Sequence, residues 1–161
     1  MHNVIQALIF PCMFIGAWYL TLSGSIPPSS PSDASLSLKA ISWLLYFAGY
    51  AFLSASIMHS VFAKKIAKSI GWISNGFQYE IAAVSLGLGI GCFYALSQGI
   101  EAKMAISLPV ISFLFFAGIN HLKEIIFNKN FAPNNTFILV WDFGVSISLL
   151  VLLIINLGQF Q

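Results

Sequence analysis

Five apolar segments, each long enough to cross a lipid bilayer as a helix, make up most of this sequence. A helix needs about 20 residues to span a hydrocarbon core that is about 30 Å thick. Polar and apolar residues do not alternate within the segments, as they would in the strands of a β-barrel. The sequence therefore predicts an all-α fold, a polytopic transmembrane helix bundle with short antiparallel connections, in which residues 1–161 form a single membrane domain. The five expected helices cover about residues 4–22, 40–63, 77–96, 105–126 and 137–157.

The scarcity of charge supports the same conclusion. Only 7% of the residues are charged and 58% are hydrophobic, whereas about a quarter of the residues in soluble domains are charged. So few charged side chains could not cover the surface of a soluble protein of this size, and the expected partner is the lipid bilayer. The net charge of +2 and the absence of arginine argue against nucleic acid as a partner.

The first segment is expected to remain as a membrane helix and not to act as a cleaved signal peptide. It has no cationic start, its apolar run is long for a signal core, and Pro11 lies inside it. Trp18 and Tyr19 near its end are typical of residues that anchor a helix at the membrane interface.

The lysines predict the direction in which the helices cross the membrane. With five crossings, the second and fourth connections lie on one side, whereas Lys39 and Lys103 lie in loops or at helix margins on the other. Cytoplasmic loops are enriched in lysine, so we expect the N-terminus in the cytoplasm and the C-terminus outside. The lysines in or beside the second and fourth connections are Lys64, Lys65, Lys68, Lys123 and Lys129.

Four ionisable residues are expected at one depth, near the cytoplasmic ends of four different helices. His59 lies near the end of the second helix and Glu80 about one turn into the third. His121 lies near the end of the fourth helix and Asp142 about two turns into the fifth. Ionisable groups inside a membrane are costly, and they commonly mark a ligand, ion or proton site. With the amides near the same level, the predicted site comprises His59, Gln78, Glu80, His121, Asn130, Asn135 and Asp142.

Helical spacing predicts that these groups face the interior of the bundle. Glu80 shares a face of its helix with Ala83, Gly87, Gly91 and Tyr94, and small residues four apart let membrane helices approach closely. A structural explanation is also open for most of the set. His59 could bond to a neighbouring helix, and His121 could form an ordinary interfacial pair with Glu124 on the same helical face. Glu80 stands in a first turn, where the helix dipole favours a carboxylate. The site of Asp142 is too deep in its helix for a capping role.

The connection between the second and third helices is amphipathic. Phe62, Ile66 and Ile70 fall on one helical face and the lysines mostly on the other, so we expect the second helix to continue along the membrane surface. Gly71 is expected to end this stretch, and Trp72 to anchor it at the headgroups. The lysines are interpreted as a basic flank that obeys the positive-inside rule, and they can also attract anionic lipid.

The sequence contains, in order, the motifs MHSVFA, IGW, FQYE, NHLKEI and NKNFAPNN with a downstream aspartate. Over about residues 40–157, these motifs resemble a family of small integral membrane proteins of unknown function in bacteria and archaea. It implies a chain in the inner (plasma) membrane of a bacterium, but it carries no activity. The family pattern has proline where this chain has Gly76, and glycine where it has Asn134, a residue that tolerates a left-handed backbone. Position by position, the signature marks His59, Gly71, Trp72, Phe77, Gln78, Glu80, His121, Asn130, Phe131, Pro133, Asn135 and Asp142.

These observations favour the binding or transport of a small ligand, ion or proton at the polar site. A carrier or channel of five helices would require assembly into a homo-oligomer. One alternative is a membrane-embedded enzyme that uses a divalent metal held by His59, Glu80, His121 and Asp142, which are adequate ligands for zinc, iron or manganese. No compact ligand spacing such as His-Glu-x-x-His and no nucleophile motif supports an enzyme. A structural or assembly subunit of a membrane complex is the third alternative.

Overall fold

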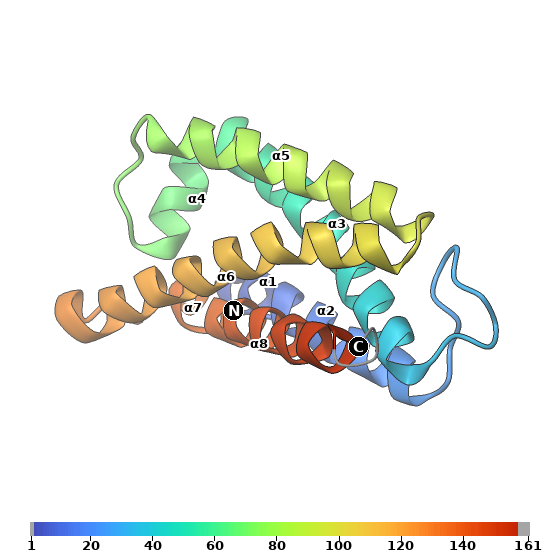
Figure 1. Ribbon diagram of the computed structural model, residues 1–161. Coiled ribbons are helices and arrows are strands. Elements are labelled where there is room, and N and C mark those ends of the chain that lie inside the picture. Colours follow the sequence, from blue (N-terminus) through green and yellow to red (C-terminus); the bar gives the residue numbers. More distant parts are fainter. Residues whose placement is uncertain (1, 158–161) are drawn as a thin grey trace.

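The computed structural model describes residues 2–157, and within them the fold contains helices and no strands (Figure 1). The helices are α1 (His2–Ala7), α2 (Ile9–Leu22), α3 (Leu36–Ser60), α4 (Ala63–Ile70), α5 (Phe77–Leu96), α6 (Ile100–Asn128), α7 (Pro133–Thr136) and α8 (Ile138–Leu157). Five spans are long and apolar enough to cross a membrane: Val4–Leu22, Leu36–Ser60, Phe77–Leu96, Ile100–Asn128 and Pro133–Asn156. The all-α bundle with five membrane helices is therefore confirmed.

The second membrane helix differs from its prediction at both ends. It begins four residues earlier than expected, at Leu36, because Ser35 acts as the N-cap and its hydroxyl accepts a hydrogen bond of 3.2 Å from the Leu38 N–H. It does not continue along the surface, because the chain leaves the helix at Val61 and Phe62 and starts again as α4. The amphipathic stretch is therefore a separate short helix.

Helix α3 lies in the centre of the bundle and supplies much of its core. Ile41, Leu45 and Ala48 are fully buried on α3, and they pack in one cluster with side chains from α2, α5, α6 and α8. The closest approach is to α5. A Cβ atom on Gly89 of α5 would lie only 2.8 Å from Leu53 Cδ2 and 3.1 Å from the Leu53 backbone nitrogen. Only glycine allows the two backbones to come this near.

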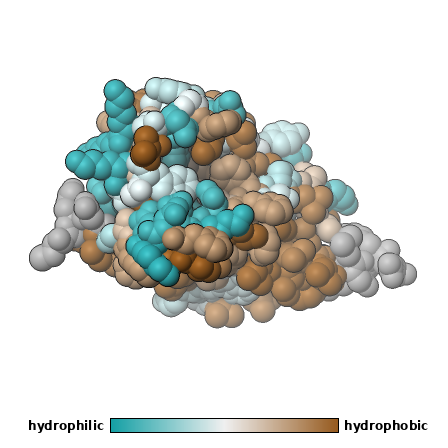
Figure 2. Space-filling view, turned by 90° about the vertical axis from the view of Figure 1, so that its left-hand side faces the viewer, coloured by the Kyte–Doolittle hydropathy of each residue, from teal (hydrophilic) through white to brown (hydrophobic). Residues whose placement is uncertain are grey.

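One end of the bundle, which we call the α4 end, carries α4 and the loop from it to α5 (Figure 1). Helix α3 ends there, α5 and α8 begin there, and α6 ends there. Figure 2 looks onto this end and shows hydrophilic side chains gathered over part of it, bordered by hydrophobic ones. Ala63 and Ala67 are the buried residues of α4, whereas Lys64, Lys65 and Lys68 are exposed. The small alanines therefore form the buried contact of α4, whereas Phe62 is exposed and Ile66 and Ile70 are partly buried.

Candidate functional site

A hydrogen-bonded network joins His121 of α6 to Asn130, which precedes α7, and to Asn135, which lies within α7. The Asn135 side chain donates from Nδ2 to the His121 carbonyl oxygen at 3.3 Å and to the Asn130 carbonyl oxygen at 3.0 Å. Its Oδ1 lies 2.8 Å from His121 Nδ1. Because an amide oxygen can only accept, His121 Nδ1 carries the proton and donates it to Asn135. The second ring nitrogen, Nε2, is therefore the atom of His121 that can gain or lose a proton.

The same network holds the end of α4 in place. Asn130 donates from Nδ2 to the Ile70 carbonyl oxygen at 2.9 Å, and its Oδ1 accepts from the Ala132 N–H at 3.2 Å. The next residue after Ile70, Gly71, has a φ of 85° and ends α4 in a left-handed conformation. A Cβ atom on Gly71 would lie 2.6 Å from Asn130 Oδ1. The backbone conformation and the space left by Asn130 thus both require glycine here.

Trp72 packs on His121. The two rings are stacked, with centroids 5.1 Å apart and an angle of 18° between their planes. Trp72 is partly buried, and its Nε1 is buried without a hydrogen-bond partner among the described residues. The sequence predicted that Trp72 anchors at the headgroups, but it did not predict that the indole ring stacks on the imidazole of His121. We call Gly71, Trp72, His121, Asn130 and Asn135 the α4 latch.

His59 and Gln78 lie on two helices that pack against each other, His59 in the last turn of α3 and Gln78 in the first turn of α5. Gln78 is only 6% exposed. Within residues 2–157, neither His59 Nδ1 nor Gln78 Oε1 has a hydrogen-bond partner, although both atoms are buried. These are polar atoms that folding has removed from water without replacing their bonds.

Asp142 is the most deeply placed of the predicted acids. It is 3% exposed, and its Cβ lies against Gly118 of α6, where an added Cβ would be 3.2 Å away. Gly118 precedes His121 by about one helical turn, so Asp142 and His121 occupy neighbouring levels of the α6–α8 interface. Asp142 Oδ2 is buried with no partner among the described residues. Asp142 is the fifth residue of α8, just past the first turn and not two turns into the helix as the sequence suggested.

Glu80 does not join the other site residues. It is exposed, and it lines an open hollow of about 240 Å³ together with Asn75, Gly76 and Phe77. The face predicted to point inward is also exposed, since Ala83 and Gly87 are exposed and Tyr94 is 65% exposed. Residues 78 and 80 are separated by about 200° around a helix. The predicted inward orientation of Glu80 is therefore wrong, because Gln78 and the buried residues on the same side of α5 face α3 instead.

The four proposed metal ligands are not assembled. No group of three His, Cys, Asp or Glu side chains that could hold a metal ion occurs within the described part of the chain. Glu80 points away from the interior, and His121 already uses Nδ1 to bond Asn135. The residues present thus do not fit a divalent metal held by His59, Glu80, His121 and Asp142.

A buried lysine at the opposite end has a role that was not predicted. Lys103 is 4% exposed, and its Nζ donates to three carbonyl oxygens at the end of α5: Ala95 at 3.0 Å, Leu96 at 3.0 Å and Gln98 at 2.6 Å. The last carbonyl oxygens of a helix lack the N–H groups of a following turn, so the ammonium group caps the C-terminal end of α5, in addition to the Gln98 N–H that also donates to the Ala95 carbonyl oxygen. The sequence contains one signal for this role. The last turn of α5 has no basic residue, and a lysine follows one turn into the next helix, after a short turn that contains glycine.

Together, the five apolar spans and the polar groups buried between them define an integral membrane protein of the polytopic helical class. The chain belongs to a family of unknown function, DUF6790, which matches residues 7–159. The matched residues include the first membrane helix, whereas the motif resemblance covers only about residues 40–157. No curated protein and no solved structure matches the chain.

The local backbone accommodates both residues at which the chain departs from the motifs expected from the sequence, Gly76 and Asn134. Gly76 has a φ of −62°, which is the value that proline adopts, so glycine and proline give the third membrane helix the same entry. Asn134 lies inside α7, and its φ is not positive. The left-handed residue of this region is Lys129, with a φ of 55°. The tolerance of asparagine for a left-handed backbone is therefore not needed at position 134.

Proposed function

We propose that the protein binds and moves a proton or a small cation at the α4 end, through His59, Gln78, His121 and Asp142. The observation that supports this proposal is the set of buried polar atoms without hydrogen-bond partners among the described residues. Three of these atoms belong to the site residues predicted from the sequence, His59 Nδ1, Gln78 Oε1 and Asp142 Oδ2, and they come from three different membrane helices. The other such atoms among the described residues are Ser30 Oγ, Ser42 Oγ, Ser85 Oγ and Trp72 Nε1. Such atoms each cost about 1–3 kcal/mol in a folded protein, and inside a membrane they commonly belong to an ion or proton pathway.

The chemistry of these atoms favours a positively charged species. Gln78 Oε1 and Asp142 Oδ2 are oxygen atoms, which attract a proton, a hydrated proton or a metal cation and repel an anion. A carboxyl group and an imidazole can also take up and release protons, whereas an amide cannot. In this proposal Asp142 and the histidines exchange the proton, and Gln78 orients His59.

The α4 latch acts as the frame for this site. Asn135 fixes the tautomer and orientation of His121 through Nδ1, so that Nε2 is the exchanging atom. Asn130 holds the end of α4, and with it the indole ring of Trp72 over the imidazole. We therefore assign Asn130 and Asn135 to positioning and not to direct contact with the ion.

We further propose that the α4 end faces the cytoplasm. Its exposed lysines are Lys64, Lys65, Lys68, Lys123 and Lys129. At the opposite end Lys103 is buried as a cap of α5, so that Lys39 is the single lysine left near a loop there. The imbalance of flanking lysines thus supports the direction expected from the positive-inside rule.

Proton movement can be tested with purified protein in liposomes that enclose a pH-sensitive dye. A potassium gradient with valinomycin drives protons inward, and the initial rate of acidification is compared with that of protein-free liposomes. The wild-type protein is expected to increase the rate, whereas D142N and H59Q should return it to the protein-free value. D33N is the matched control, because Asp33 is an exposed carboxyl group in the loop before α3 and should leave the rate unchanged.

Two results would contradict the proposal. Conduction in D142N at the wild-type rate would remove Asp142 from the pathway. If the wild type conducts neither protons nor sodium or potassium ions in parallel flux assays, transport at this site is excluded. Circular dichroism of each variant in detergent checks that a lost rate is not a lost fold.

A further inference from the structure

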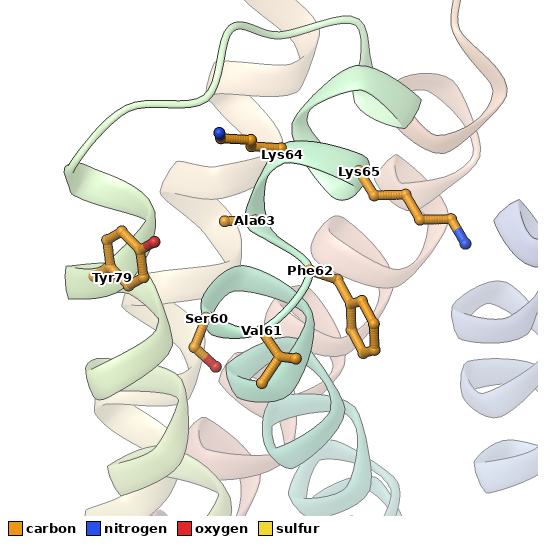
Figure 3. Close-up of a pocket in the computed structure, with 7 residues that line it drawn as sticks. All are labelled: Ser60, Val61, Phe62, Ala63, Lys64, Lys65 and Tyr79. Atoms are coloured by element: carbon orange, nitrogen blue, oxygen red, sulfur yellow. The ribbon is translucent and has the colours of Figure 1, made fainter.

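A surface hollow lies at the corner between α3 and α4, separate from the buried polar site. Its volume is about 310 Å³, and it is lined by the end of α3, the start of α4 and one residue of α5. Figure 3 shows Ser60 and Val61 at the end of α3, Lys64 and Lys65 on α4, and Tyr79 across the gap on α5. The hollow is therefore formed where a membrane helix ends and a basic helix begins.

The lining combines positive charge with hydroxyl groups. Lys64 and Lys65 are both exposed, and the described residues around the hollow include no acidic side chain. Ser60 and Tyr79 contribute the hydroxyl groups, and Tyr79 is 62% exposed. Ammonium and hydroxyl groups are donors that match the oxygen atoms of a phosphate group.

Apolar side chains complete the same hollow. Val61 and Phe62 line it and are 72% and 51% exposed. They follow directly on Ser60, the last residue of a membrane helix, so they lie at the level where acyl chains meet headgroups. A water-soluble anion would use the lysines but would leave these two apolar side chains uncovered.

We propose that this hollow binds the phosphate headgroup of an anionic phospholipid. Lys64 and Lys65, which leave α4 in opposite directions in Figure 3, would turn their flexible side chains to the phosphate, and Val61 and Phe62 would face the acyl chains. The complementarity of charge and the exposed apolar pair at one corner select a lipid over free phosphate. The lipid would brace the junction of α3 and α4, next to the turn that carries His59. This inference does not depend on proton or cation movement at the buried site.

Native mass spectrometry of the detergent-purified protein can test the assignment. The protein is titrated with dioleoyl-phosphatidylglycerol and, separately, with dioleoyl-phosphatidylcholine. Each lysine near an anionic headgroup contributes about a fivefold gain in affinity. K64Q/K65Q should therefore weaken phosphatidylglycerol binding by about 30-fold and leave phosphatidylcholine binding unchanged. K123Q/K129Q is the matched control, because it removes the same charge from two exposed lysines at the same end of the bundle, one in α6 and one directly after it.

The outcomes separate this hollow from general attraction between charges. An equal loss in both double variants, or no loss in K64Q/K65Q, would overturn the proposal. Displacement of the lipid by millimolar inorganic phosphate would also overturn it, since the apolar contacts would then add nothing. V61S should weaken phosphatidylglycerol binding although it keeps both lysines, and an unchanged affinity in V61S would contradict a role for the apolar pair.

Discussion

The tightest constraint in the α4 latch is Gly71, and replacing it with alanine should destabilise the protein by about 2–5 kcal/mol. A left-handed conformation costs a residue other than glycine about 1–2 kcal/mol, and Gly71 has a φ of 85°. The new methyl group would also lie 2.6 Å from Asn130 Oδ1, so the asparagine side chain must move. That movement breaks its bonds to Ile70 and Ala132, at about 0.5–1.5 kcal/mol each.

Chemical unfolding in detergent, followed by circular dichroism, measures this cost. G76A is the matched control, because Gly76 lies in the same loop, has a φ of −62° and has no described atom within 4 Å of an added Cβ. The substitution N130A separates the two parts of the effect. In a background that already carries N130A, G71A should cost only the backbone term of about 1–2 kcal/mol.

Two results would refute this reasoning. If G71A and G76A unfold alike, neither the left-handed backbone nor Asn130 restricts position 71. If G71A lowers the free energy of unfolding equally with and without N130A, the contact between Gly71 and Asn130 does not contribute to stability.

Two further predictions concern the packing that supports the site. The substitution K103M should lower the free energy of unfolding by about 1–3 kcal/mol, because three carbonyl oxygens lose the ammonium donor; K39M serves as the control in the same unfolding assay. The substitution G89A should cost about 1–3 kcal/mol, because the added methyl group meets Leu53 at 2.8 Å. G87A, two residues away, has no described atom within 4 Å of its added Cβ and should be neutral or slightly stabilising; equal effects of the two would contradict the close approach of α3 and α5.

The number and type of the helices followed from the sequence because length and hydropathy alone decide whether a helix can cross a bilayer. The depth of the polar residues followed for the same reason, since each helix rises by a fixed distance per residue. His59, His121 and Asp142 thus reached one end of the bundle as expected. The break between α3 and α4 did not follow, because the residues at 61 and 62 are apolar and carry no glycine or proline to mark the end of a helix.

The rotation of α5 about its own axis was the main error. In a soluble helix, polar residues mark the face that meets water, but α5 is apolar on all sides apart from its first turn. Small residues lie both on the stripe of Ala82, Ser85 and Gly89 and on the opposite stripe of Ala83 and Gly87. The small-residue pattern could therefore be assigned to either face, and only the contact of Gly89 with Leu53 distinguishes them.

Two groups of polar residues at the α4 end differ in whether their buried atoms have hydrogen-bond partners, which argues for different roles. Around Asn130 and Asn135, every hydrogen bond described above serves to hold a backbone segment or a ring in place, which accounts for these residues by stability alone. His59, Gln78 and Asp142 lie within the same end of the bundle, yet each buries an atom with no partner in the described residues. Apolar side chains of similar size would avoid that cost of about 1–3 kcal/mol per atom. Stability therefore explains the asparagines but not His59, Gln78 and Asp142, and it is the chemistry of these three residues that matches a proton or a cation.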